Sequence, residues 1–406
     1  MRIALFSDDY LPASTLIHAK MLHELAIRLI SLGHVVIVVT PFFEHSTQKI
    51  QIDSIDGVEI WRFRSGKTRG VNKIARAVNE FSFSYKAWSS IKHKVIKNPF
   101  DLCINYSPTI FFGPLINKIK SNNSECFSYL ILRDMFPQWI IDEGMISNNS
   151  PIASFFRYFE RVNYRSSNVI GLMSEANIRY FKELHPQFTN IQVLRNWADT
   201  VPLGNDSCLT GFKEKYQLGD KVVFFYGGNI GHAQNMENLL RLAKRLKEFP
   251  KAHFFFVGQG DEVELLLQRK QDWTLENITY IPSVPQAEFK QLLIEADIGL
   301  FSLSVTHKAH NFPGKLLGYM VESKPILGSV NPGNDLLDLI NQDQSGYAFV
   351  NGQDDELFEA ALKLLEDKED RLLKGDNAYK SLLKHFSVES AADQIIFEAE
   401  KALMLK

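Results

Sequence analysis

The stretch VVFFYGGNIGHAQNMENLL, residues 222–240, decides the fold class of this chain. Its first five residues form a continuous apolar run, typical of a strand buried on both faces of a sheet. Gly227, Gly228 and Gly231 follow, and Met236 and Leu239 then fall on one face of a helix. A buried strand that turns through glycines into a helix is the unit from which parallel sheets are built, so we expect an α/β protein.

The same alternation of strands and helices extends in both directions from this stretch. The expected strands of a first series are 2–6, 35–39, 58–63, 102–105, 129–132 and 169–173, with helices over 15–32, 74–97, 107–120, 151–165 and 175–185. The expected strands of a second series are 222–226, 253–257, 278–281, 298–303 and 325–327, with helices over 236–249, 261–270, 286–295 and 314–322. The pattern resets at a polar stretch near 198–215, which predicts two doubly wound, Rossmann-like domains with an interdomain cleft.

The predicted domain boundaries follow from that reset. We expect a first domain over 1–205, a second over 206–384, and a capped helix over 385–406 that crosses back to the first domain.

At 406 residues the chain is too long for one ordinary core. The net charge of −2 gives no electrostatic case for nucleic acid as a partner.

Cysteines and motifs narrow the chemistry further. Cys103, Cys126 and Cys208 are widely spaced and cannot pair completely, which favours a reducing compartment. The sequence has no metal-binding motif, so no metal cofactor is expected. Apolar runs stay below the ~18 residues that span a bilayer, so any membrane contact should be peripheral.

Glycine-rich or permissive loops follow three strands of the second domain, and they predict a nucleotide site. Permissive loops let a ligand approach the backbone closely, although the same glycines also suit tight turns. The candidate residues of this nucleotide site are Gly228, Asn229, Gly231, His232, Gly258, Gln259, Ser283 and Val284.

A fourth segment adds a cation to this group of loops. Asn311, Phe312, Pro313, Gly314 and Lys315 open an expected helix, with the proline near its first position. A helix start presents unpaired N–H groups, and Lys315 adds a full charge, so a phosphate or diphosphate is the expected guest. The alternative is a plain turn with a solvated lysine.

Polar side chains at strand ends of the first domain suggest an acceptor site. Asp9 and His18 follow the first strand, and Asp134 follows the fifth. Carboxylates and an imidazole at one sheet edge can orient a hydroxyl or assist proton transfer, whereas each one alone is equally a cap or a solvated group.

Two expected helices of the first domain combine bases with aromatic residues. The first contains Lys86, Trp88, Lys92 and Lys94, and its stripe of Ile74, Val78, Phe81, Tyr85, Trp88 and Val95 suits either an anionic membrane surface or packing on the sheet. The second begins after Ser150 and repeats the pattern with Phe155, Phe156, Phe159 and arginines at 157, 161 and 165. Core packing and a lipid-linked partner both remain open for it.

The chain resembles glycosyltransferase family 4, whose members have the GT-B fold. The resemblance covers nearly the whole length and rests on motifs in a fixed order: Tyr10-Leu11-Pro12, Leu194-Arg195-Asn196-Trp197, Gly227–Gly231, Val257–Gly260, Ala296–Leu300 and Pro313–Pro325. More narrowly, residues 132–137, 228–231 and 310–315 are similar to bacterial O-antigen enzymes that transfer N-acetyl-L-fucosamine to a lipid-diphosphate sugar.

This resemblance implies a UDP-sugar donor on the second domain and an acceptor on the first. It gives Lys315 the role of the cation at the departing diphosphate. Where the family has two glutamates, this chain has His310 and Gly318, so His310 becomes a catalytic candidate in place of a carboxylate. Ser14 replaces a family glycine after the tyrosine–proline loop and is counted with the donor contacts, and Asn229 replaces a family arginine.

The resulting hypothesis is a metal-independent transferase that extends a polyprenyl-diphosphate-linked sugar in O-antigen or related polysaccharide synthesis. Its expected place is the cytoplasmic face of the bacterial inner membrane. The alternatives are a nucleotide-sugar 2-epimerase of the same architecture and a GT-B scaffold without catalysis.

Overall fold

The computed structural model divides the chain into two compact units. The N-terminal unit comprises Met1–Trp197 and Val388–Lys406, and the C-terminal unit comprises Ala198–Ser387. The first unit thus ends at Trp197 rather than at 205, and the chain returns to it at Val388 rather than at 385. The structure describes residues 1–404 except 13, 15–16, 44–47, 69–72, 108, 143, 199, 203–210 and 306–311, and only the backbone of 17, 73–75 and 286–287.

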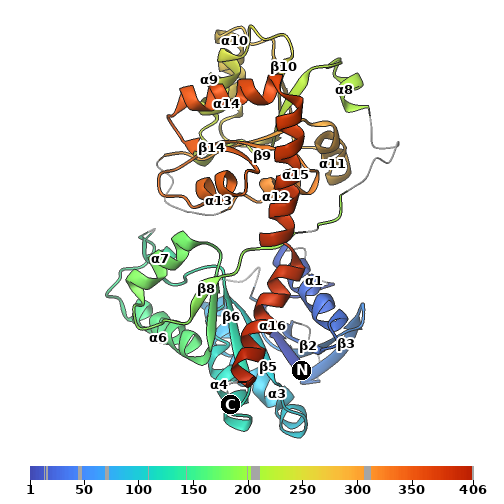
Figure 1. The fold of residues 1–406 in the computed structure, drawn as a ribbon. Coiled ribbons are helices and arrows are strands. Elements are labelled where there is room, and N and C mark those ends of the chain that lie inside the picture. The colour runs from blue at the N-terminus through green and yellow to red at the C-terminus, as the bar shows by residue number, and fades with distance from the viewer. Residues whose placement is uncertain are drawn as a thin grey trace. The chain divides into compact units, whose positions relative to one another are not determined.

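The N-terminal unit is built on an eight-stranded sheet in the order β3-β4-β2-β1-β5-β6-β7-β8 (Figure 1). All neighbours pair in parallel except β3 and β4, which are antiparallel. The strands are β1 (Arg2–Phe6), β2 (Val35–Phe42), β3 (Ile50–Ile55), β4 (Val58–Arg64), β5 (Leu102–Ser107), β6 (Phe127–Leu132), β7 (Val169–Leu172) and β8 (Ile191–Val193). The helices are α1 (Ile17–Ser31), α2 (Lys73–Phe81), α3 (Phe83–Lys97), α4 (Gly113–Asn122), α5 (Gln138–Asp142), α6 (Pro151–Ser166), α7 (Glu175–Leu184) and α16 (Val388–Met404).

The C-terminal unit has a six-stranded sheet in the order β11-β10-β9-β12-β13-β14, the strand order of a Rossmann domain. All its pairs are parallel. The strands are β9 (Val222–Asn229), β10 (Ala252–Gln259), β11 (Ile278–Ile281), β12 (Ile298–Ser302), β13 (Ile326–Val330) and β14 (Gly346–Val350). The helices are α8 (Phe212–Lys215), η2 (His232–Gln234), α9 (Met236–Arg245), α10 (Val263–Asp272), α11 (Gln286–Glu295), α12 (Lys315–Val321), α13 (Leu336–Gln342), α14 (Asp354–Glu366) and α15 (Lys368–His385).

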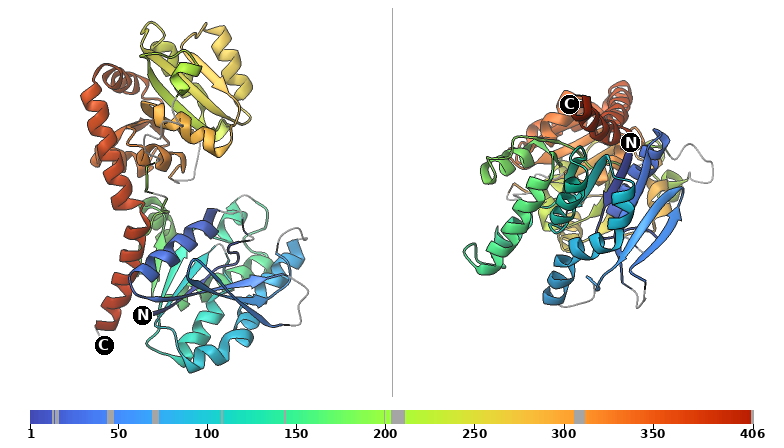
Figure 2. Two further views of the ribbon diagram at one scale, coloured as in Figure 1. Left: turned by 90° about the vertical axis from the view of Figure 1, so that its right-hand side faces the viewer. Right: turned by 90° about the horizontal axis from the view of Figure 1, so that it is seen from below.

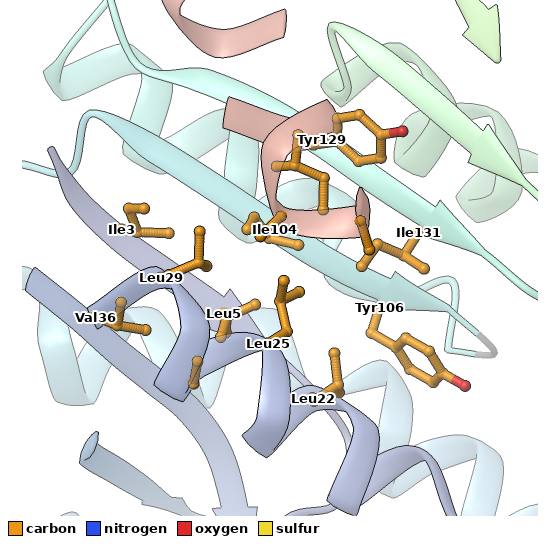
Figure 3. Packing of buried hydrophobic residues seen from close by; sticks show 14 of the residues in the cluster. Ile3, Leu5, Leu22, Leu25, Leu29, Val36, Ile104, Tyr106, Tyr129 and Ile131 are labelled. Carbon is orange, nitrogen blue, oxygen red and sulfur yellow. The ribbon is translucent and has the colours of Figure 1, made fainter. Parts of the chain in front are cut away.

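Apolar side chains on both faces of each sheet form the cores. In β1, Ile3 and Leu5 enter one buried cluster and Ala4 and Phe6 the cluster on the opposite face, as the two-residue period of a strand requires. Figure 3 shows the first of these clusters, where Leu22, Leu25 and Leu29 of α1 lie over strands β1, β2, β5 and β6. Figure 2 shows from two further directions that helices cover both faces of each sheet. The α/β, doubly wound fold class is therefore confirmed.

The C-terminal helix completes the core of the N-terminal unit. Ala391, Ala392, Ile395 and Ala399 of α16 belong to the same buried cluster as Leu25. The Gln394 amide Nε2 also donates a hydrogen bond to the carbonyl oxygen of Val193, at 2.7 Å. The segment after Ser387 thus supplies one wall of a core that begins at the other end of the chain.

Several elements differ from the sequence expectation. The expected helix 74–97 is two helices, because the chain breaks at Ser82 between α2 and α3. Helix α4 begins at Gly113, with Pro114 in its first turn, and not at 107. The short strands β3, β8 and β14 were not expected, because runs of three to six residues carry little periodicity.

Candidate functional site

The strand order places one topological switch point in each sheet. In the C-terminal unit it lies between β9 and β12, from which the order runs outward in opposite directions. In the N-terminal unit it lies between β1 and β5. Ligands of open α/β sheets bind beyond the carboxyl ends of strands at such points, so the side chains that follow these four strands define the candidate sites.

Gly228 and Lys315 come together at the switch point of the C-terminal unit. Gly228 has a φ of 112°, which favours glycine. A Cβ added to Gly228 would meet only Lys315 within 4 Å, with Cε at 3.7 Å and Nζ at 3.8 Å. The loop after β9 therefore has a bare backbone face beside the lysine.

The ammonium group of Lys315 is buried against an aromatic ring. Its Nζ lies 3.5 Å from the ring centroid of Tyr226, in a cation–π contact. Among the described residues this Nζ has no hydrogen-bond partner. Burial disfavours the charged form and lowers the pKa of Lys315 to about 7. An anion that reached this ammonium group would replace the interactions with water that the lysine lost on burial.

The loop around Lys315 is held by hydroxyl groups of two buried tyrosines. The Tyr226 hydroxyl donates to the carbonyl oxygen of Asn229, at 2.5 Å. The Tyr319 hydroxyl accepts from the Gly227 amide at 3.2 Å and donates to the carbonyl oxygen of Leu300 at 3.1 Å. These bonds join β9 to β12 through α12, so the lysine and the glycine loop are fixed relative to each other.

Gly258 and the nearby Gly260 serve packing. A Cβ at Gly258 would lie 1.8 Å from the carbonyl oxygen of Gly228, and one at Gly260 would lie 2.1 Å from that of Ile230. The ends of β9 and β10 thus approach at backbone distance. Gly258 and its neighbour Gln259, whose carbonyl accepts from the Ile230 amide at 2.9 Å, shape the loop that faces Lys315.

The start of helix α9 is already occupied by carboxylates of the protein itself. The Glu262 carboxylate accepts from the Met236 amide at 2.9 Å, and that of Asp261 accepts from the His232 amide at 3.0 Å. A Cβ at Gly231 would lie 3.0 Å from the Asp261 carboxylate. Two negative groups at this point repel a phosphate, so Gly231 and His232 are poorly placed as diphosphate ligands.

The remaining predicted donor contacts are scattered. Phe312 packs on Phe386 with ring centroids 4.3 Å apart. Pro313 is half-buried, and Gly314 is exposed with open space where a Cβ would stand. Ser283 and Val284 follow β11, which β10 separates from β9. Helix α12 is only seven residues long, so the charge of Lys315 attracts an anion more strongly than the helix dipole does. His310 and Asn311 lie outside the described residues.

The switch point of the N-terminal unit gathers acidic and ring side chains around Tyr106. The His18 ring stacks on Tyr106 with centroids 5.2 Å apart, and its Nε2 lies 3.9 Å from the Asp8 carboxylate. Burial raises the pKa of Tyr106 to about 12, Arg133 opposes this rise, and Asp134 and Asp8 add to it. His18 and Asp134, predicted from separate strand ends, thus share one neighbour.

Asp134 is an exposed residue whose carboxyl pKa is raised by partial desolvation, despite the opposing charge of Arg133. The guanidinium of Arg133 is itself buried, which lowers its pKa to about 10, and it donates to the carbonyl oxygen of Leu194 at 2.7 Å. Arg133 therefore anchors the loop after β6 and leaves Asp134 at the sheet edge.

The other predicted residues of the first strand's loop bond to each other. The Ser14 hydroxyl donates to the Asp9 carboxylate, and the Ser7 hydroxyl donates to the Asp9 carbonyl oxygen at 2.8 Å. Ser14 is therefore tied to an acceptor-side residue of its own unit. Asp9 shapes the loop, while its neighbour Asp8 faces His18.

Sequence reasoning missed several members of this cluster. Glu80 of α2 pairs with Arg76 at 2.7 Å, and burial raises the pKa of Glu80 while the Asp8 charge adds to the rise. Tyr106, at the end of β5, was also missed. Tyr106 could have been selected if the strand order were known, because the end of β5 lies at the switch point. Nothing in the sequence indicates that Glu80 of α2 lies near that point.

The predicted membrane residues of α3 divide between core and surface. Trp88 packs against the buried cluster under the sheet, beside residues such as Ala87 and Ile91. Lys94 lies over the Trp61 ring, with Nζ 5.5 Å from its centroid. Lys86 and Lys92 are half-buried, and burial lowers the pKa of Lys86. The expected single stripe is therefore corrected: Val78, Phe81 and Tyr85 are exposed, whereas Val95 is buried and Trp88 packs against the same cluster as Val95.

The described residues contain neither a group of side chains that could hold a metal ion nor a helix that could span a membrane. No three His, Cys, Asp or Glu side chains in that part of the chain gather closely enough to hold a metal ion. Within the same residues, no helix combines the length and the apolar character needed to cross a bilayer.

Comparisons with known proteins identify one domain and the fold. Residues 210–381 match the family described as Glycosyl transferases group 1. The probable glycosyltransferase WbjE of Pseudomonas aeruginosa is 23% identical over 320 residues, which cover 76% of each chain. The putative colanic acid biosynthesis glycosyl transferase WcaI of Escherichia coli is 23% identical over 296 residues, which cover 70% of this chain and 72% of WcaI.

Solved structures resemble the chain over its whole length. Anabaena HepE in complex with UDP has a TM-score of 0.64 at 14% identity and covers 99% of this chain and 100% of its own. Sucrose-phosphate synthase of Thermosynechococcus elongatus has a TM-score of 0.62 at 13% identity, with both chains covered completely. The fold is therefore GT-B, and the match to the glycosyl transferases group 1 family lies within the C-terminal unit.

Proposed function

We propose, starting from this family match, that the protein transfers a sugar from a UDP-sugar to a hydroxyl of a polyprenyl-diphosphate-linked acceptor sugar. The C-terminal unit would bind the donor and the N-terminal unit the acceptor. The observation that carries the proposal is the buried Nζ of Lys315, which has no hydrogen-bond partner among the described residues and lies beside the bare backbone of Gly228.

Lys315 has the chemistry that a departing diphosphate requires. In the transfer, the bond between the anomeric carbon and the diphosphate oxygen breaks, and negative charge grows on that oxygen. A protonated Lys315 beside it stabilises this charge most at the transition state, which lowers the barrier. The Tyr226 ring supports the ammonium through its face without neutralising it.

The polar groups around Tyr106 suit the acceptor. The attacking hydroxyl forms its bond to the anomeric carbon and gives up its proton. Asp134, His18 and Asp8 are groups that can orient that hydroxyl or accept the proton, and partial desolvation raises the pKa of Asp134. No metal ion takes part in the proposed reaction.

The finer assignments follow the sequence resemblance and the names of the relatives. UDP is the proposed nucleotide, because HepE, which shares the fold, was solved with UDP and with UDP-glucose. N-acetyl-L-fucosamine is the first sugar to test. The E. coli relative is named for colanic acid biosynthesis, and synthesis of a bacterial polysaccharide is the proposed pathway class. The cytoplasmic face of the inner membrane is the proposed place of action.

The test is a product assay with purified protein. A panel of UDP-sugars is incubated with and without a lipid-diphosphate N-acetylglucosamine acceptor, in the presence of EDTA and in its absence, and products are followed by mass spectrometry. We expect a product one sugar heavier than the acceptor, in equal amount with EDTA. Epimerised nucleotide sugar without acceptor would instead establish a 2-epimerase, and tight UDP binding without any product would establish a scaffold.

A further inference from the structure

Helix α6 exposes several of its large apolar side chains, unlike an ordinary amphipathic helix, which buries them. Its buried residues are Ala153, Glu160, Asn163, Tyr164 and Ser166. Its exposed residues include Ile152, Phe155 and Tyr158, with exposed fractions of 56%, 40% and 57%. Apart from Tyr164, the helix therefore turns small and polar side chains inward, while several large apolar side chains face outward.

The packing of α6 on α4 explains the inward face. A Cβ at Gly113 of α4 would lie 2.6 Å from the Asn163 Cα, so the two helices approach at backbone distance. Large side chains do not fit into such a contact. Figure 1 labels both helices in the N-terminal unit, with α7 beside α6. Among the described residues, Ile152, Phe155 and Tyr158 of α6 therefore stay exposed on the side away from this contact.

The exposed rings of α6 join rings from three other segments into one surface. Phe81 of α2 lies 5.3 Å from Phe159 and 5.7 Å from Phe155, measured between centroids. Phe111, which follows β5, lies 5.3 Å from Phe159, and Phe136, which follows β6, lies 4.8 Å from Phe156. We call this surface the aromatic face: Phe81, Phe136, Phe155, Phe156, Tyr158 and Phe159, with Phe111 buried among them at 3% exposure. None of these described rings belongs to the buried clusters of the unit.

The aromatic face is bordered by positive charge. Helices α2, α3 and α6 contain only two acidic residues, Glu80 and Glu160, whose side chains are 13% and 2% exposed. Arg161 and Arg165 of α6 are exposed. Asp134 and Asp142, on either side of Phe136 in the sequence, are exposed, whereas α6 itself combines exposed rings and exposed arginines with one buried acid. This combination on α6 is the composition of helices that lie in the interface of an anionic membrane.

We infer that the aromatic face is the surface by which the N-terminal unit docks on a membrane of anionic lipids, with the rings at the headgroup boundary and Arg161 and Arg165 on phosphates. A second copy of the chain fits less well, because a two-fold contact would bring the cationic helices together. The segments after β5 and β6 that contribute rings to this region also lie next to Tyr106 and Asp134 in the sequence. Docking there would bring a lipid-linked acceptor to that edge, which is the one point at which the inference rests on the proposed function.

The first experiment measures binding to vesicles of phosphatidylethanolamine with phosphatidylglycerol, by co-sedimentation without any donor sugar. The double variant F155S/Y158S should bind at least ~10-fold more weakly, because two rings lose their burial in lipid. F397S is the matched control, because Phe397 is 62% exposed on α16 of the same unit. Its binding should equal that of the wild type. Circular dichroism and the unfolding midpoint check that both variants fold.

Two further arms test the mode of contact. Tyr158→Trp should show a blue-shifted fluorescence that brominated lipids quench. R161E/R165E should lose the preference for vesicles that contain phosphatidylglycerol over those of phosphatidylethanolamine alone. An unshifted fluorescence of Tyr158→Trp, or equal weakening by F397S, would overturn the inference. The inference would also be overturned if the wild type sedimented as a dimer without lipid and the F155S/Y158S variant sedimented as a monomer.

The outcome is separable from that of the transferase assay. Turnover of a UDP-sugar on a water-soluble acceptor, together with failure to bind vesicles, would overturn membrane docking and leave the proposed function. Vesicle binding through the aromatic face without turnover of any UDP-sugar would overturn the proposed function and leave the docking surface.

Discussion

The two switch points of this protein have opposite chemical character. At the end of β9 the C-terminal unit places one buried cation beside a bare glycine backbone. Beyond β1 and β5 the N-terminal unit places Asp8, His18 and Asp134 around Tyr106. The same sheet topology thus carries a cationic site in one unit and a site of acidic and ring side chains in the other. The difference teaches that the chemistry of each site is set by the side chains after equivalent strands, since the strand orders themselves are similar.

The largest expected effect separates the two sites by their kinetics. His18→Gln and Asp134→Asn should each lower kcat by roughly 10²–10⁴-fold, because they remove a group that handles the acceptor proton. UDP affinity, measured by calorimetry, should stay unchanged in both. His93→Gln, an exposed histidine of α3, is the control. A parallel loss of UDP affinity would show that these residues belong to the donor site.

The second effect removes the cation of the other site. Lys315→Met should weaken UDP binding by about 1.5–3 kcal/mol, or roughly 10–150-fold, because a charge-assisted contact is lost. The matched control is Lys244→Met, whose Nζ lies 4.7 Å from the Trp273 ring centroid on the same unit. Calorimetry with UDP measures both. Unchanged affinity in Lys315→Met would remove this lysine from the donor site.

The third effect is a dependence of UDP binding on pH. The pKa of Lys315 in the free protein is about 7, and a bound diphosphate favours the charged form and raises that pKa. Affinity should therefore fall as pH rises above 7, by at most about tenfold per unit, with uptake of a proton on binding. Calorimetry in buffers of different ionisation heat measures that uptake. Lys315→Arg, which stays charged, should abolish it, and proton uptake retained in this variant would assign the titration to another group.

The smallest effect concerns the stability of the protein without ligand. Burial holds the pKa of Lys315 below its ordinary 10.5, so the unfolded chain binds the extra proton between about pH 7 and 10.5. The free energy of unfolding should rise with pH in this window, and Lys315→Met should remove the rise and stabilise the protein at pH 7 by ~1–2 kcal/mol. Denaturant unfolding at several pH values measures it. A destabilised Lys315→Met would mean that the Tyr226 contact outweighs the cost of burial.

Part of the site was predictable from local sequence, and part was not. Lys315 and Gly228 were both selected from separate motifs, because glycine after a buried strand and lysine after a turn have recognisable chemistry. Gly258 was selected for the same reason, but its missing Cβ serves the close approach of two strands. The carboxylates of Asp261 and Glu262 over the start of α9 could not be foreseen, since they belong to a different strand's loop.

The helices of the N-terminal unit show the limit of periodicity. The apolar stripes of α3 and α6 looked alike, yet α3 buries Ala87, Ile91 and Val95 against the sheet while α6 exposes Phe155 and Tyr158. A stripe states that a helix has an apolar face, and it does not state which neighbour covers that face. Contact at backbone distance with Gly113 decided the matter for α6.

The sequence by itself determined the α/β alternation, the two sheets and the segments that carry a lysine, glycines and carboxylates to strand ends, because strand burial, helix periodicity and turn chemistry are local properties. Only the tertiary structure decided which strand ends lie at the switch points and that the Lys315 ammonium is buried on Tyr226. It also decided that the rings of α6 face outward. These depend on strand order and on helix packing between residues far apart in the chain, which no local pattern records.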